Sequence, residues 1–160
     1  RSYSVTGVQT CALPIYSVDK QVRQQKMIDD LQWTWSDGWL LMSLYLAGRD
    51  QGAELYEILG AADATNHAIP TTREMSRALS KFMQCGLIRE HEGRYTIVDE
   101  YVPAIKKAHD ERGGLFAAGD KGVKWLLRAH LPMQRSVSVE VTDADMKAAY
   151  DQYTKALRSR

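Results

Sequence analysis

The sequence predicts a mainly α-helical fold with one small β-hairpin. Two observations support this class. Most of the chain consists of segments that repeat apolar residues at helical spacing and carry capping residues at their ends. In addition, two short runs, Leu87 to His91 and Arg94 to Val98, flank the dipeptide Glu92-Gly93, whose glycine suits a tight hairpin turn.

The first predicted helix lies in the segment WTWSDGWLLMSLYLAG, with Ser36 as its N-cap and Gly48 as its left-handed stop. Apolar residues surround this helix on nearly all sides, so we expect it to be central. Trp33, Trp35 and Trp39 could form a base-stacking or ligand platform, but packing in the core or at a dimer contact is the favoured interpretation.

The next two helices are predicted on either side of a proline. A helix within residues 53–69 ends before Pro70, because the residue before proline avoids helical geometry. A further helix spans residues 72–84, because Thr71 and Glu74 have the spacing of a capping box ahead of it.

Three more elements are predicted beyond the hairpin, together with one short strand. A fourth helix is capped by Asp99, and a fifth occupies about residues 119–131. Residues 136–141 alternate valine with other residues and predict a short strand, after which Thr142 caps a final helix. This last helix buries its apolar edge on its own domain or against a second subunit, and both arrangements remain open.

The N-terminal residues 1–15 resemble the translation of a common short-read sequencing adapter. Val5 to Ile15, VTGVQTCALPI, can be written codon by codon as that adapter with its index primer. The segment lacks the basic start and the continuous apolar core of a signal peptide. We therefore expect residues 1–16 to be non-native and loosely attached, with interpretable protein beginning between Ser17 and Met27.

Excluding this segment makes the chain electrically neutral. The sequence has 21 Lys and Arg against 20 Asp and Glu, and Arg1 is the only charged residue excluded, so 21 minus 1 leaves 20 of each. Any affinity for nucleic acid must then come from a local basic patch. Cys85 becomes the only cysteine, which excludes an internal disulfide and a cysteine-based metal cluster.

The helix over residues 72–84 carries the main functional prediction. Its apolar residues cluster on one side, and the opposite side is polar with three cations. Arginine and glutamine read base edges in a major groove, while serine, threonine and lysine hold phosphates. A solvated helix face is polar in the same way, so this helix alone leaves both interpretations open. The residues on the polar side are Arg73, Ser76, Arg77, Ser80, Lys81 and Gln84.

The order of these elements resembles a winged helix-turn-helix domain. Three helices, the third basic and capped, are followed at once by a β-hairpin, and the resemblance covers roughly Trp35 to Val98. The same segment looks like a group of bacterial winged-helix proteins without an assigned activity. The resemblance implies a winged-helix domain over residues 17–98, with its core from about residue 33, and a C-terminal helical extension over residues 99–160.

Membership of this fold implies that the third helix enters the major groove and that the hairpin lies beside the phosphate backbone. Arg89 and Arg94 are then candidate phosphate contacts, whereas Glu90 and Glu92 would repel phosphate. The predicted DNA-binding residues are Thr72, Arg73, Ser76, Arg77, Ser80, Lys81, Gln84, Arg89 and Arg94.

The sequence thus favours a cytoplasmic, non-enzymatic DNA-binding protein, a transcription regulator without a cofactor or a metal. It lacks a phosphate-binding loop, a nucleophile elbow and a paired-histidine zinc motif, and Cys85 is expected to be inert. The expected partners are double-stranded DNA and a second copy through the C-terminal helices, with no membrane. Two alternatives stay open: a protein-interaction module on the same fold, and a small-molecule sensor with a pocket lined by the tryptophans and the later helices.

Overall fold

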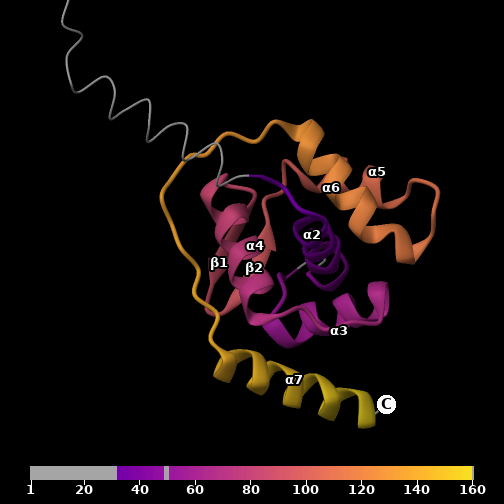
Figure 1. Ribbon diagram of the computed structural model, residues 1–160, viewed down its shortest axis with the longest axis vertical. Coiled ribbons are helices and arrows are strands. Elements are labelled where there is room, and N and C mark those ends of the chain that lie inside the picture. The colour runs from indigo at the N-terminus through magenta and orange to yellow at the C-terminus, as the bar shows by residue number, and fades with distance from the viewer. Residues whose placement is uncertain (1–31, 49–50, 160) are drawn as a thin grey trace, which may run out of the picture. The chain divides into compact units, whose positions relative to one another are not determined.

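The structure, a computed structural model, describes residues 32–48 and 51–159 (Figure 1). The predictions for the adapter-like segment and the start of the protein lie outside the described residues. The described part is mainly helical with one two-stranded antiparallel sheet, which confirms the predicted class. No helix in it is long and apolar enough to cross a membrane. The elements are α2 (Trp35–Ala47), α3 (Leu55–Asn66), α4 (Thr72–Gln84), β1 (Ile88–His91), β2 (Arg94–Ile97), α5 (Val102–His109), η1 (Leu115–Ala117), α6 (Ala118–Ala129) and α7 (Asp143–Arg158).

Helix α2 is the central element, as predicted (Figure 1). It packs against α3, α4, α5 and α6, and residues 39–44 are all buried. The indole N–H of Trp39 donates to Thr65 Oγ1 of α3 at 2.9 Å, and Trp33 stacks on Phe82 of α4 with ring centroids 6.0 Å apart. For these two tryptophans, packing in the core is the arrangement observed.

The predicted N-cap of α2 is wrong by two residues. Thr34 caps the helix, because its hydroxyl accepts from the Asp37 N–H and the Asp37 carboxylate accepts from the Thr34 N–H. An acidic residue three positions on makes this capping box available to Thr34 and not to Ser36. The hydroxyl of Ser36 instead donates to the Glu74 carboxylate of α4 at 2.9 Å.

Helices α2 and α6 touch backbone to backbone. A Cβ atom on Gly38 would overlap the backbone of Gly119 and Val123, and one on Gly122 would overlap the backbone of Gly38. The indole of Trp35 covers Gly119 just as closely. Glycine is required at this crossing because only a hydrogen atom fits between the two helices.

The predicted hairpin forms directly after α4. Its turn residues Glu92 and Gly93 have φ angles of 52° and 77°, as a type I′ turn requires. A third segment joins the edge of the sheet, because Ala53, between α2 and α3, exchanges two backbone hydrogen bonds of 2.8 and 2.9 Å with Tyr95. These two bonds attach the hairpin to the segment that connects α2 and α3.

The N-caps predicted for α4 and α7 are confirmed. The Thr71 hydroxyl accepts from the Glu74 N–H at 3.2 Å, and the Thr142 hydroxyl accepts from the Asp145 N–H at 3.1 Å. In both helices the acidic side chain bonds back to the N-cap backbone, which completes a capping box.

Two predictions between the hairpin and α7 are wrong. Helix α5 begins at Val102 and not after a cap at Asp99, because Pro103 in its first turn pre-sets the helical backbone. Residues 136–141 do not form a strand. Their backbone groups bond to side chains of α4 instead of to a neighbouring strand.

Helix α7 packs on α3 of the same chain. Met146 and Ala149 are buried in the same core as the central helices, and the Tyr153 hydroxyl donates to the Asp63 carboxylate of α3 at 2.5 Å. This hydrogen bond and burial raise the pKa of Tyr153 to about 12. Helix α7 therefore packs on its own domain, while Tyr150 and Leu157 of its apolar edge stay 45% and 51% exposed. A contact of this helix with a second copy stays a prediction.

Candidate nucleic-acid interface

The polar face of α4 is covered by residues 134–142, here called the strap, which run alongside α4 between α6 and α7 (Figure 1). Ser76 Oγ accepts from the Val141 N–H at 3.0 Å and donates to the Val141 carbonyl at 3.1 Å. Ser80 makes the same pair of bonds with Val139, at 2.8 and 3.2 Å. One hydroxyl thus satisfies both backbone groups of one strap residue.

The contact continues at both ends of α4. The Gln84 side-chain amide donates to the Val137 carbonyl at 2.7 Å, and the Gln84 carbonyl accepts from the Gln134 N–H at 2.8 Å. At the other end, the Thr72 hydroxyl donates to the Asp143 carboxylate at 2.5 Å, at the first residue of α7. The strap therefore follows α4 from end to end.

The spacing of these bonds explains why the strap is extended. Residues four apart on a helix are separated by about 6 Å along its axis, and two residues of an extended chain rise by about 6.6 Å. The polar positions 76, 80 and 84 therefore meet every second residue of the strap. The valines at every second strap position predicted a strand. In the structure, the same spacing places the backbone groups of these valines opposite the polar side chains of α4.

Lys81 does not lie on the exposed face of α4, which corrects the prediction. Its side chain is only 4% exposed, and its Nζ lies 2.7 Å from the buried Asp37 carboxylate of α2. The ammonium also donates to the Gln32 carbonyl at 2.5 Å and lies 5.5 Å from the centroid of the Trp33 ring. The helical projection puts Lys81 at the border between the polar and the apolar face of α4. The Asp37 carboxylate of α2 holds its side chain on the buried side of that border.

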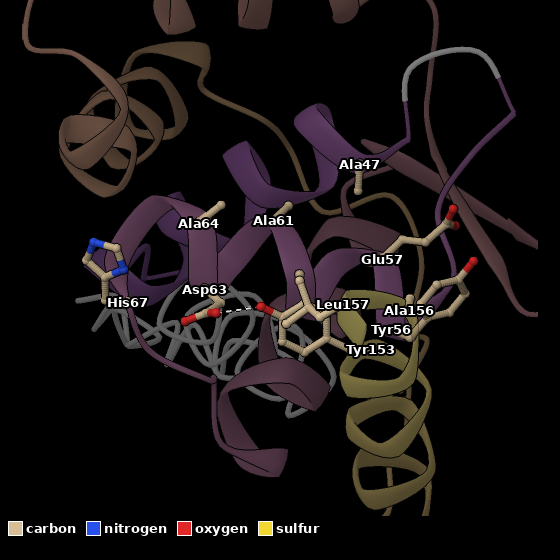
Figure 2. A pocket seen from close by; sticks show the side chains of 11 residues that line it. Ala47, Tyr56, Glu57, Ala61, Asp63, Ala64, His67, Tyr153, Ala156 and Leu157 are labelled. Atoms are coloured by element: carbon tan, nitrogen blue, oxygen red, sulfur yellow. Dashed lines mark hydrogen bonds between the residues drawn. The ribbon is translucent and has the colours of Figure 1, made fainter. Parts of the chain in front are cut away.

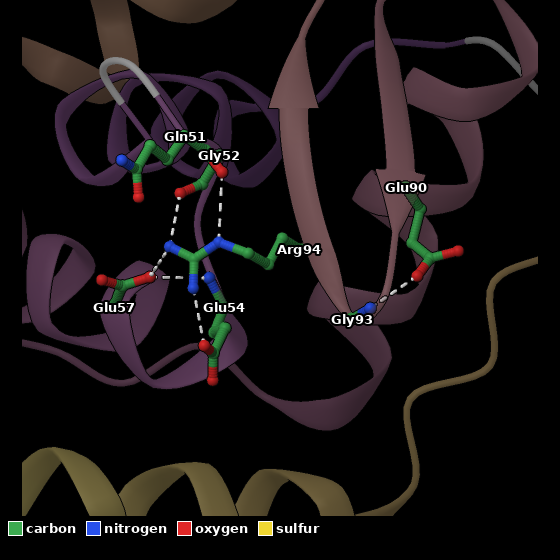
Figure 3. Close-up of polar contacts among 7 residues, drawn as sticks. All are labelled: Gln51, Gly52, Glu54, Glu57, Glu90, Gly93 and Arg94. Atoms are coloured by element: carbon green, nitrogen blue, oxygen red, sulfur yellow. Dashed lines mark hydrogen bonds and ion pairs between the residues drawn. The ribbon is translucent and has the colours of Figure 1, made fainter.

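Arg94 is held by the start of α3 and the segment before it (Figure 3). Its guanidinium donates to the carboxylates of Glu54 at 2.6 Å and Glu57 at 3.0 Å. It also donates to the carbonyls of Gly52 at 2.9 Å and Gln51 at 3.1 Å. These four bonds link β2 to α3, so the guanidinium is already occupied in the place where a phosphate contact was predicted.

The turn of the hairpin is acidic. The Glu90 carboxylate accepts from the Gly93 N–H at 2.7 Å and so closes the turn (Figure 3). Glu92 points into solvent at the tip, and Arg89 is the exposed cation of β1. The hairpin thus presents two carboxylates against one available arginine, a weak surface for phosphate.

Arg73 and Arg77 are the exposed cations of α4. They lie one helical turn apart, and both side chains are exposed. Neither of them, nor Arg89, has a hydrogen bond or ion pair with any described residue. The predicted site residues therefore fall into two groups, three exposed arginines and six side chains that already contact the protein itself. The second group is Thr72, Ser76, Ser80, Lys81, Gln84 and Arg94.

The described residues hold no candidate metal site. Within residues 32–48 and 51–159, no set of three or more His, Cys, Asp or Glu is placed to hold a metal ion. Cys85 is fully buried, and burial raises the pKa of its thiol to about 11, so it stays protonated and inert. His67 and His130 end their helices in the left-handed conformation, as capping residues.

The strap residues were missed because no local signal links them to α4. Val139 and Val141 lie 59 and 65 residues away from their serine partners. The only hint in the sequence is the match between polar residues four apart on α4 and valines two apart in the strap.

Comparisons of the chain with protein families, curated proteins and solved structures found no match.

Proposed function

We propose that this chain is a winged-helix DNA-binding protein, a transcription regulator, in which α4 is the major-groove helix and the strap masks it. The observation that carries the proposal is a pair of exposed arginines, Arg73 and Arg77, on the third helix of a helix-helix-helix-hairpin order. The pairing of Ala53 with Tyr95 supports it, because a third short strand beside the hairpin is typical of winged helices.

The strap has to leave α4 before the helix can enter DNA. A helix with its side chains is about 10–12 Å wide, and the major groove of B-DNA is about 12 Å wide. The groove therefore admits α4 alone and not α4 with a chain segment on its reading face. The strap is attached by neutral hydrogen bonds, each of which contributes about 1 kcal/mol net, and by Val141, whose side chain is 5% exposed and belongs to the core. Its release therefore costs several kcal/mol, which the contacts of α4 with DNA have to offset.

A second function is favoured by the strap itself. Three polar side chains of α4 already bind an extended backbone, which is the type of ligand that peptide-binding modules recognise. The neutral charge of residues 17–160 and the acidic hairpin turn also favour a protein partner. On this alternative, the released α4 binds an extended segment of another protein and not DNA.

The first test releases the strap without changing α4. Replacing Val139 and Val141 by proline removes the two N–H groups that donate hydrogen bonds to the hydroxyls of Ser80 and Ser76. We expect at least about a tenfold gain in affinity for a 20-base-pair duplex, measured by fluorescence anisotropy, because two hydrogen bonds that hold the mask are lost. Ser138→Pro is the matched control, because the Ser138 N–H has no hydrogen-bond partner in the described part of the chain.

The second arm of this test asks whether α4 is the surface that binds. In the released variant, the double substitution Arg73→Ala and Arg77→Ala should abolish most of the affinity for DNA. The slope of log affinity against log salt concentration should fall by about two, because two phosphate contacts are lost. Arg128→Ala, an exposed arginine on α6, should change little. The DNA proposal is contradicted if the affinity for DNA is unchanged when the two α4 arginines are replaced. It is also contradicted if the released variant binds the duplex no more tightly than wild type. Binding of a synthetic 134–142 peptide without DNA binding favours the interaction module.

A further inference from the structure

A cavity of about 630 Å³ lies between α3 and α7 (Figure 2). Its volume is within the range of about 300–1,000 Å³ that is typical of small-molecule sites. Ala47 at the end of α2 completes the wall, and the three N-terminal tryptophans do not line it. The cavity is therefore different from the tryptophan-lined pocket that the sequence suggested for a sensor.

Small residues on both helices leave this space open. Gly60, Ala61 and Ala64 of α3 face Ala156 of α7, and none of them has a side chain long enough to fill the gap. The ring of Tyr153 crosses between the helices, and a Cβ atom on Gly60 would lie 3.1 Å from it. The helices are thus bridged at one point and stay apart beside it.

Asp63 is the unbalanced charge in this cavity. Of the two carboxylates in its wall, Glu57 is paired with Arg94 at 3.0 Å. Asp63 accepts from the Tyr153 hydroxyl at 2.5 Å (Figure 2), and among the described residues no basic side chain pairs with it. The hydroxyl is a neutral donor, so the negative charge of Asp63 faces the cavity uncompensated.

We propose that this cavity binds a small organic cation, an amine carried on an aromatic or apolar body. The ammonium group pairs with Asp63 beside the ring of Tyr153, and the ring of Tyr56 lines the other end of the cavity, where it can contact the body of the ligand. The apolar body packs on the small residues and on Leu157. A carboxylate ligand is disfavoured, because Asp63 would repel it. The strap and α4 do not line this cavity, so the proposal is independent of the DNA proposal.

Phenethylamine is a suitable probe, with 2-phenylethanol and phenylacetate as its neutral and anionic counterparts of similar size. Calorimetric titration of the full chain should give a dissociation constant for the amine on the order of 1 mM or lower. We expect the alcohol to bind at least tenfold more weakly and phenylacetate not to bind. An amine that binds no more tightly than the alcohol overturns the proposal.

Two variants locate the site. Asp63→Asn keeps an acceptor for Tyr153 but removes the charge, so the amine should bind at least tenfold more weakly, like the alcohol. Asp151→Asn is the matched control, because Asp151 is an exposed carboxylate on α7 that pairs with Lys147. Ala64→Trp fills the cavity from an exposed position and should abolish binding while circular dichroism stays unchanged. Wild-type affinity in the Asp63 variant or in the Ala64 variant overturns the proposal.

Discussion

Replacing Lys81 by methionine is expected to lower the free energy of unfolding by about 3 kcal/mol. The side chains of Lys81 and Asp37 are 4% and 2% exposed, and their charged atoms are 2.7 Å apart. Methionine fills a similar volume but leaves the Asp37 carboxylate buried without its cation. Urea unfolding followed by circular dichroism measures the change, with Arg77→Met as the control on the exposed side of the same helix.

A second substitution separates charge from packing in this prediction. Asp37→Asn in the Lys81→Met background removes the unpaired charge and keeps an oxygen that accepts from the Thr34 N–H. The double variant should recover at least about 1 kcal/mol relative to Lys81→Met, because the two side chains are coupled. A loss for Lys81→Met as small as the one for Arg77→Met would contradict the buried ion pair.

Gly122→Ala is expected to cost about 3 kcal/mol of unfolding free energy, at the upper end of the usual cost of overpacking. The added methyl group meets the backbone of Gly38 on α2, which has no side-chain rotamer through which to yield. Gly60→Ala on α3 is the matched control, because its methyl group meets only the edge of the Tyr153 ring, at 3.1 Å. The helical preference for alanine over glycine, about 1 kcal/mol, partly offsets that contact.

Thermal and urea unfolding of both glycine variants measure this difference. Gly122→Ala should unfold at clearly lower urea concentration than wild type, and Gly60→Ala should stay within about 1 kcal/mol of it. Equal stability of the two variants would show that α2 and α6 do not meet through their backbones.

Elements decided by neighbouring residues could be predicted from the sequence. The Thr71–Glu74 capping box starts α4, and Glu92-Gly93 makes the hairpin turn, because in both cases the interacting groups lie within three residues of one another. The start of α2 predicted at Ser36 lies two residues too late, although the capping box around Thr34 is equally local.

Features decided by distant partners could not be predicted. The periodicity of α4 separates an apolar side from a polar side, but water and an extended chain segment suit a polar side equally well. Lys81 is drawn inward by a carboxylate 44 residues away, and Ser76 is covered by a strap residue 65 residues away. Within the candidate interface, the exposure of Arg73 and Arg77 agrees with the helical projection.

The covering of α4 by the strap is tested most directly by amide hydrogen exchange in the full chain. The N–H groups of Val139 and Val141 donate to serines of α4, whereas Ser138 and Glu140 are exposed and their N–H groups have no hydrogen-bond partner in the described part of the chain. Exchange followed by NMR should therefore alternate along the strap, with the two valines slowed at least about tenfold relative to their neighbours. Uniform exchange of all four amides at the rate of an unstructured peptide would contradict the mask on α4.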